Sequence, residues 1–382
     1  MSRPSQIDKI ELIDESLAND LAAYGKRYRE RTLKIAIWFV VLGSITGGLL
    51  SSLIPIKLFV SLIVGSLLLG WSYCHYLTIL LEKQFQNRNF NSLSSNLDRA
   101  ILWSSIFYPI TFFELSSCYL LQIKLLLIQG RCVELEALAR MAWASQQNEA
   151  ISVGFPKNSL LANTLACSYL GQRRDIQAVP ILENLLRAEK RKEIIRVLAV
   201  NLALCHIRLK EFEKAQKVLE KHEKSLDKSP DMVQARFNLI QACINTQKEK
   251  YDLATEQIKQ ALVEGKSAKE SIEFMAQCQA VLGRIRFGQG RGEEGELHFK
   301  TAIDMIKTNA NPDYLTLAQI LEEHASCLEQ NGQHDESEAI KAESRHCESL
   351  YLERELSKID SIKTRISQKK PTLMLTHIIN KS

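Results

Sequence analysis

A few histidines and cysteines of this chain are spaced so that they could bind a metal ion. His324 and Cys327 are three residues apart, and His346 and Cys347 follow further along the chain. Zinc uses such ligands, but a zinc site needs four that converge on one point. Cys327 comes two residues after Ala325, a small residue at an expected packing position, so a buried thiol explains it. We therefore predict no metal site.

Catalytic groups are equally hard to find. Cys205 and His206 are neighbours and His222 follows, but no carboxylate or nucleophile stands at a recognisable spacing from them. The glycine-rich run 288–295 is not preceded by a strand, so it predicts a turn between helices and not a phosphate-binding loop. Acidic residues alternate with Lys and Arg, as on solvated helix faces. We expect no catalytic residues, no cofactor and no small-molecule substrate, and hence no enzyme.

Composition favours helices and argues against nucleic-acid binding. Among 382 residues there are only 8 prolines and 16 glycines, while Ala, Leu, Glu, Lys and Gln are frequent. The net charge of +5 comes from 49 basic and 44 acidic residues, without a basic stripe in the C-terminal two thirds. The nine cysteines include no CxxC pair and lie among apolar residues, which indicates buried, reduced thiols.

Beyond residue 114 the sequence repeats itself with a period near 40. A small residue marks one position of each unit, early in the second helix of an expected helix pair: Ala137, Ala178, Ala215, Ala254, Gly295 and Ser337. Twelve residues earlier, in the first helix, stand Leu125, Ala166, Ala203, Ala242, Gly283 and Ala325. Small side chains at both positions predict that the two helices of a pair cross closely there.

A turn is expected between the two helices of each pair. Glycine just past a helix end is a stop signal. The predicted turns are Gly130-Arg131, Gly171-Gln172, Lys210-Glu211, Gly290-Arg291 and Gly332-Gln333. In the fourth unit the residues 248–250 replace the glycine, so the signal for that turn is weaker.

These units resemble the tetratricopeptide repeat. The resemblance rests on Ala203 with Phe212 and Ala215, on Ala242 with Tyr251 and Ala254, and on Gly283 with Gly290, Phe299 and Ala302. It covers residues 115–350 and implies an all-α, right-handed solenoid of about six helix pairs. The chain departs from the family pattern in its longer period, in Lys341 at an apolar position, and in Pro180 early in a second helix.

The resemblance also implies a binding surface, because the first helix of each pair lines the concave side of such solenoids. Carried over unit by unit, this surface would contain Asn163, Arg208, Arg236, Leu239, Arg284, Phe287 and Gln319, together with Cys167, Leu204, Ile207 and Cys243. Arginine and amide groups beside apolar side chains suit a peptide with acidic and hydrophobic residues. An ordinary surface charge remains the alternative for each arginine.

The N-terminal part predicts a transmembrane hairpin over residues 35–81. The runs 35–56 and 58–81 lack charged residues, apart from Lys57 between them, and each is long enough to span a bilayer. Basic residues flank both outer ends, which predicts that both ends and the repeats are cytoplasmic. The run 100–113 could be a surface helix, a cap on the first repeat or, within 100–128, a third span.

We expect five regions: a cytoplasmic segment 1–34, the hairpin 35–81, a linker or membrane-proximal helix 82–114, the repeats 115–350, and a helix with a basic tail 351–382. The predicted function is that of an integral membrane adaptor or scaffold that binds a protein or peptide partner. A structural subunit of a larger membrane complex is the alternative. A regulator of a signalling pathway, and an enzyme with a site in 82–114 or between repeats, are further ones.

Overall fold

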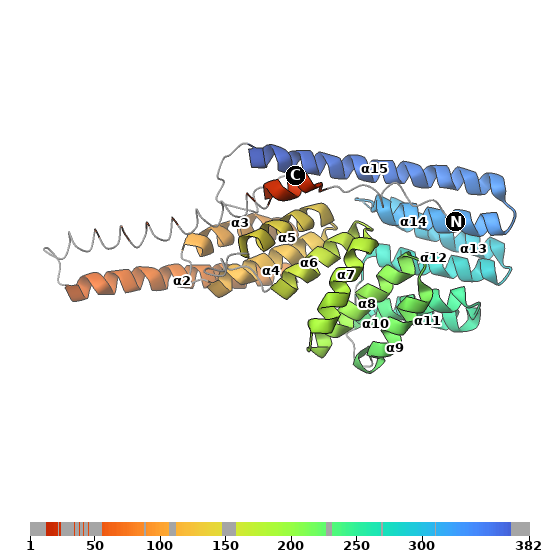
Figure 1. The fold of residues 1–382 in the computed structure, drawn as a ribbon, viewed down its shortest axis with the longest axis horizontal. Coiled ribbons are helices and arrows are strands. Elements are labelled where there is room, and N and C mark those ends of the chain that lie inside the picture. Colours follow the sequence, from red (N-terminus) through yellow and green to blue (C-terminus); the bar gives the residue numbers. More distant parts are fainter. Residues whose placement is uncertain are drawn as a thin grey trace. The chain divides into compact units, whose positions relative to one another are not determined.

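A computed structural model describes most of the chain. The described residues are 56–87, 89–106, 112–146, 158–226, 231–268, 270–309 and 311–367, with 13–21 and five single residues (23, 34, 38, 41 and 45) before them. Within these ranges every regular element is an α-helix (Figure 1). This agrees with the predicted all-α fold.

The helices before residue 172 are α2 (Ile56–Gln86), α3 (Phe90–Ile106), α4 (Phe112–Ile128), α5 (Cys132–Gln146) and α6 (Asn158–Gly171). Those that follow are α7 (Asp175–Ala188), α8 (Lys192–Arg208), α9 (Phe212–Leu226), α10 (Asp231–Gln247), α11 (Tyr251–Ser267), α12 (Ile272–Gly288), α13 (Gly292–Lys307), α14 (Tyr314–Gln330) and α15 (His334–Ser367). The chain forms two compact units: unit 1 contains residues 1–10 and 169–356, and unit 2 contains residues 11–168 and 357–382.

The same turn closes six helix pairs, from α4/α5 to α14/α15. In each turn a backbone N–H donates to the carbonyl oxygen five residues earlier, as in the Schellman motif. The donor–acceptor pairs are Arg131–Leu126, Arg174–Tyr169, Glu211–His206, Lys250–Asn245, Arg291–Arg286 and Gln333–Leu328, at 2.7–3.0 Å. These six turns confirm the predicted number of helix pairs.

The residue before each donor has a positive φ. Glycine takes this position in three turns, as Gly130, Gly290 and Gly332. In the other three it is Arg173, Lys210 and Glu249, with φ of 57–60°. The turn predicted at Gly171-Gln172 was therefore misplaced, because α6 continues through Gly171 and the left-handed residue is Arg173. The fourth turn, which has no glycine, has the same hydrogen bonds as the others.

Small residues lie where the two helices of a pair cross. In α12/α13, a Cβ added to Gly283 would lie 3.1 Å from the carbonyl oxygen of Gly295, and one added to Gly295 would lie 3.0 Å from that of Gly283. The alanines at the equivalent positions of the preceding pairs are fully buried. In α14/α15 the hydroxyl of Ser337 donates to the carbonyl of Ala325 at 2.9 Å. The predicted close crossings are thus confirmed.

Unit 1 stacks these pairs one after another (Figure 1). Each gap between pairs holds an apolar cluster. One is built around Leu219 and Ile240, the next around Ile258 and Cys278, and a third around Phe299 and Leu321. Seven of the nine cysteines are buried, so the predicted burial of the thiols is largely confirmed. A stack of pairs buries apolar faces that no pair could cover alone.

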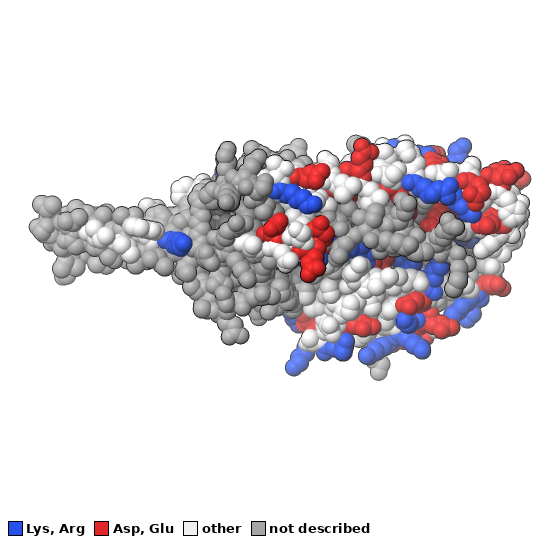
Figure 2. Space-filling model, turned by 45° about the horizontal axis from the view of Figure 1, so that its top comes forward, with Lys and Arg blue, Asp and Glu red and all other residues white. Residues whose placement is uncertain are grey.

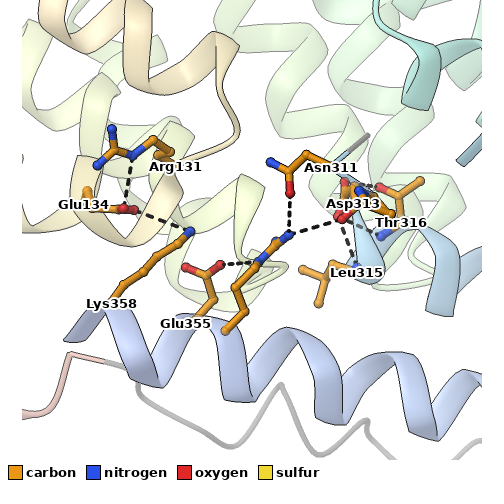
Figure 3. A network of polar contacts seen from close by, with 10 residues as sticks. Arg131, Glu134, Asn311, Asp313, Leu315, Thr316, Glu355 and Lys358 are labelled. Carbon is orange, nitrogen blue, oxygen red and sulfur yellow. Dashed lines mark hydrogen bonds and ion pairs between the residues drawn. The ribbon is translucent and has the colours of Figure 1, made fainter. Parts of the chain in front are cut away.

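Helix α15 continues well past the expected end of the repeats. Arg354 donates to the carbonyl of Pro312 at 3.2 Å and to Glu355 at 3.1 Å in unit 1 (Figure 3). In unit 2, Lys358 lies 3.9 Å from Glu134, which also pairs with Arg131 at 3.1 Å. Lys341, at an expected apolar position, instead forms ion pairs with Glu329 and Glu338.

Unit 2 contains a bundle of α2, α3 and α4 together with a short N-terminal helix. Packing among the three long helices buries Leu81, Leu97 and Tyr119. The N-terminal helix covers residues 15–21 and is capped by Asp14, whose carboxylate accepts the N–H of Leu17 at 2.7 Å. The run 100–113 is divided between α3 and α4, with residues 107–111 outside the described ranges.

The structure does not support the predicted transmembrane hairpin. Its first span, 35–56, lies outside the described residues except for Trp38, Val41, Ile45 and the first residue of α2. Of the helices in the described part of the chain, none is both long enough and apolar enough to cross a bilayer. Side chains of α2 are described from Gly65 onward, with that of Ser66 excepted, and this stretch includes His75, Glu82 and Lys83.

Candidate functional site

Arg208, at the end of α8, reaches back to the start of unit 1. Its Nη1 donates to the carbonyl of Leu170 at 2.9 Å and to Oδ1 of Asp175 at 3.4 Å. The side chains of Arg208 and Asp175 are only 14% and 6% exposed. The Nε of Arg208 is buried without a hydrogen-bond partner. The guanidinium therefore bridges two helix pairs and retains one unused donor.

Arg284 on α12 and Gln319 on α14 meet at a second carboxylate. Arg284 Nη1 lies 3.8 Å from Oε2 of Glu323, and Gln319 Nε2 donates to its Oε1 at 2.8 Å. The Oε1 of Gln319 is buried without a hydrogen-bond partner. Since the Arg284 and Glu323 side chains are 21% and 25% exposed, a ligand could reach both.

Arg173, which the sequence did not single out, connects these two groups. Its Nη2 donates to the hydroxyl of Thr316 at 3.2 Å, across 143 residues of sequence. That hydroxyl donates to Oδ2 of Asp313 at 2.7 Å, while Oδ1 of Asp313 accepts the N–H groups of Leu315 and Thr316. Asp313 thus caps α14 and orients the acceptor of Arg173. We call Arg173, Asp175, Arg208, Arg284, Asp313, Thr316, Gln319 and Glu323 the charged cluster.

Burial and mutual repulsion shape the electrostatics of this cluster. Burial, and then the charge of Arg208, lower the pKa of the Arg173 guanidinium to about 10, against the pull of Asp313 and Asp175. Burial also raises the pKa of Asp175, although Arg208 and Arg173 oppose that shift. Two guanidinium groups are therefore held close together in a poorly solvated place, where a further carboxylate would be attracted to both.

Arg236 uses its guanidinium for a structural pair. Its Nε and Nη2 donate to the two carboxylate oxygens of Glu270 at 3.0 and 3.3 Å. Glu270 is 4% exposed and precedes α12, whereas Arg236 is 41% exposed. This two-pronged geometry is specific to arginine and joins α10 to the α11–α12 connection. No described contact places Arg236 in the charged cluster.

Leu239 and Phe287 are each 6% exposed and belong to the core. Leu239 packs with Ala235 and Ile258, and Phe287 lies beside Phe299 with a ring separation of 6.1 Å. A ligand could touch them only if the helices moved apart. Their periodicity could not reveal this, because apolar residues on a first helix can face either a ligand or the next pair.

Asn163 lies on α6 in unit 2 and is half-buried. Its Oδ1 accepts from Cys167 Sγ at 4.0 Å within the same helix. Of the predicted binding residues, the structure therefore brings together Arg208, Arg284 and Gln319. Sequence analysis missed Arg173, Asp175 and Glu323, because charged residues on a helical repeat give no signal that distinguishes an inner charge from a solvated one.

Histidines and cysteines near these helices are chemically quiet. Burial raises the pKa of Cys243 to about 11 and that of Cys327 to about 12, so both thiols stay protonated near neutral pH. His324 stacks on Phe299 with a ring separation of 4.6 Å, and both its nitrogens lack hydrogen-bond partners. In the described part of the chain no three His, Cys, Asp or Glu side chains are grouped to hold a metal ion.

Acidic and basic side chains are interspersed on the face seen in Figure 2, where neither sign forms a continuous stripe. Many of them pair across helices, as Lys307 does with Glu343 at 2.6 Å. A phosphate backbone is bound by an excess of positive charge. This face therefore has no feature that favours a nucleic acid.

No protein-family model and no curated protein sequence matches the chain. Among solved structures, the chain is similar to the apo form of the quorum sensor NprR from B. thuringiensis. The two share 14% sequence identity, and the match covers 83% of this chain and 98% of that one, with a TM-score of 0.45. A likeness this distant supports no conclusion on function, which has to come from the residues themselves.

Proposed function

We propose that this protein is an adaptor that binds an extended peptide or protein segment at the charged cluster, through acidic and apolar side chains of the ligand. The observation that carries the proposal is the convergence of Arg208, Arg284 and Gln319 from the first helices of three different pairs. They meet in a place where one guanidinium nitrogen and one amide oxygen are buried without partners.

The chemistry of the cluster restricts the ligand. Its arginines already interact with Asp175, Asp313 and Glu323. A ligand carboxylate must therefore compete with a carboxylate of the chain, and it gains only the difference between the two interactions. We expect moderate affinity that decreases as salt is added, because the exchanged groups are charged.

Affinity capture with the full chain tests this proposal. The wild type is compared with a variant that carries both Arg208→Gln and Arg284→Gln, each of which keeps a polar side chain of similar length. Arg187→Gln is the matched control, since Arg187 is exposed near the end of α7 and contacts only neighbours on its own helix. We expect at least about tenfold less of the captured partner with the double variant, the ratio of one charged hydrogen bond.

Circular dichroism must show that the double variant keeps its helices at the assay temperature. Equal capture by the wild type and the folded double variant would exclude the charged cluster as the binding site. Loss of capture with Arg187→Gln would also contradict the proposal, since it would place the partner on the outer face of α7.

We also propose that residues 35–81 attach the protein to a membrane. The uncharged runs of this segment support this, and so do the described side chains of α2. Leu67, Leu68 and Leu69 are 37%, 56% and 74% exposed, although consecutive residues point in different directions around a helix. Trp71, Tyr73 and Tyr76 follow and are exposed too, as aromatic residues are at a bilayer interface.

Extraction from membranes at alkaline pH separates the possible outcomes. An attached protein stays with the lipid fraction, and deletion of residues 35–81 releases it. Release of the wild type by alkali would contradict attachment through a hydrophobic segment. Crosslinking at Gly43 or Gly65 to another protein, in place of lipid, would favour the alternative of a subunit in a membrane complex.

A further inference from the structure

The contact between Arg173 and Thr316 joins the beginning of unit 1 to its last helix pair. Arg173 stands in the turn between α6 and α7, and Thr316 lies in the first turn of α14. Between them lie the three helix pairs from α8 to α13. An array of stacked pairs normally has contacts only between neighbours. A bond between its first turn and its last pair therefore constrains every pair between them.

The conformation of Arg173 indicates that this contact is maintained at a cost. Its φ is 59°, in the left-handed region where residues with a Cβ are disfavoured. Lys210 and Glu249 take the same position in the next two turns, with φ of 60° and 57°. Neither of these two side chains has a described hydrogen bond across helix pairs. Arg173 is thus the member of this group whose side chain links distant parts of unit 1.

The acceptor of Arg173 is held in place independently. The carboxylate of Asp313 accepts the Thr316 hydroxyl proton at 2.7 Å, and this leaves the lone pairs of that hydroxyl directed to Arg173. Arg208, which bonds the Leu170 carbonyl before the same turn, fixes the other side of the turn. The turn is therefore fastened to α8 by Arg208 and to α14 by Arg173.

We propose that Arg173 is a latch that holds unit 1 closed between the α6–α7 turn and α14, and that a ligand must release this latch to reach the charged cluster. The inference deepens the proposed function and depends on it for the identity of the site. A ligand carboxylate bound to Arg173 and Arg208 would take the place of Thr316 as acceptor. Unit 1 would then open along the pairs between the turn and α14.

Hydrogen exchange of the full chain, followed by mass spectrometry without any ligand, tests the latch. Arg173→Gly removes the side chain and relieves the positive φ. Lys210→Gly is the matched control, because it relieves the same strain at the equivalent position and leaves the latch intact. We expect the amides of residues 313–323 to exchange about tenfold faster in Arg173→Gly than in Lys210→Gly, the ratio of one charged hydrogen bond.

A double-mutant cycle makes the test specific. Thr316→Val removes the acceptor and leaves the Oδ1 cap of Asp313, so it should also speed exchange at 313–323. Combined with Arg173→Gly it should add little, since both changes break the same bond. Equal exchange in Arg173→Gly and Lys210→Gly, or fully additive effects of the pair, would overturn the latch. Because no ligand is present, either result leaves the capture experiment to decide the proposed function.

Discussion

The repeat pairs of unit 1 and the α2–α4 bundle of unit 2 are both helical, but they treat apolar side chains differently. In unit 1, Phe299 and Ile258 are completely buried between pairs, and the outward faces of α11 and α13 are charged. In unit 2, α2 leaves Leu69 and Tyr76 more than half exposed. Unit 1 therefore satisfies its own apolar surface, whereas α2 has apolar surface that a lipid or protein could cover.

The largest effect that distinguishes the two units should come from truncating a core aromatic residue. Phe299→Ala removes a fully buried ring that stacks on His324, so we expect a loss of about 3–5 kcal/mol in the free energy of unfolding. Leu69→Ala in α2 should change it by less than about 0.5 kcal/mol, because that side chain is 74% exposed. Urea unfolding followed by circular dichroism measures both. Equal losses would show that α2 is as well packed as α13.

Helix crossings provide the next contrast. The Cβ of Gly295→Ala would lie 2.5 Å from the ring of Phe287 and 3.0 Å from the Gly283 carbonyl, so we expect a loss of about 1–3 kcal/mol. A Cβ at Gly65 in α2 would meet no atom within 4 Å. Gly65→Ala should therefore stabilise its helix, by about 1 kcal/mol at most. Thermal unfolding of the two variants checks the opposite signs, and destabilisation by Gly65→Ala would reveal a close neighbour of α2.

The smallest effect concerns the pH dependence of unit 1. Burial lowers the pKa of His324, against a weaker upward influence of Glu296. Below the unfolded pKa of about 6.5, the unfolded chain then binds a proton that the folded chain does not. The free energy of unfolding should decrease as pH falls below this value, by up to about 1.4 kcal/mol per pH unit from this group.

His324→Phe keeps a flat ring against Phe299 and removes the titration. The pH dependence of its urea midpoint between pH 6.5 and 5 should accordingly be weaker than that of the wild type. A steeper dependence in the variant would mean that His324 is stabilised as a cation in the folded protein, which would contradict the burial of its unpartnered nitrogens.

Much of the fold could be predicted because its determinants are close in sequence. The residues that cross within a pair, such as Gly283 and Gly295, are separated by one turn, and their small size is visible in every unit. The turn itself was harder to locate, since Arg173 takes a left-handed conformation without being glycine. The hydrogen bonds of the turn, and not the residue type, determined that position.

The sequence by itself determined the helical class, the six pairs and the small residues at their crossings, because these follow from local spacing and side-chain size. Only the tertiary structure decided that Arg236 pairs with Glu270, that Leu239 and Phe287 belong to the core, and that Arg173 reaches Thr316. These outcomes depend on how far each pair is rotated against the next. Small rotations add up over many residues, so a contact across 143 positions cannot be inferred from any one repeat.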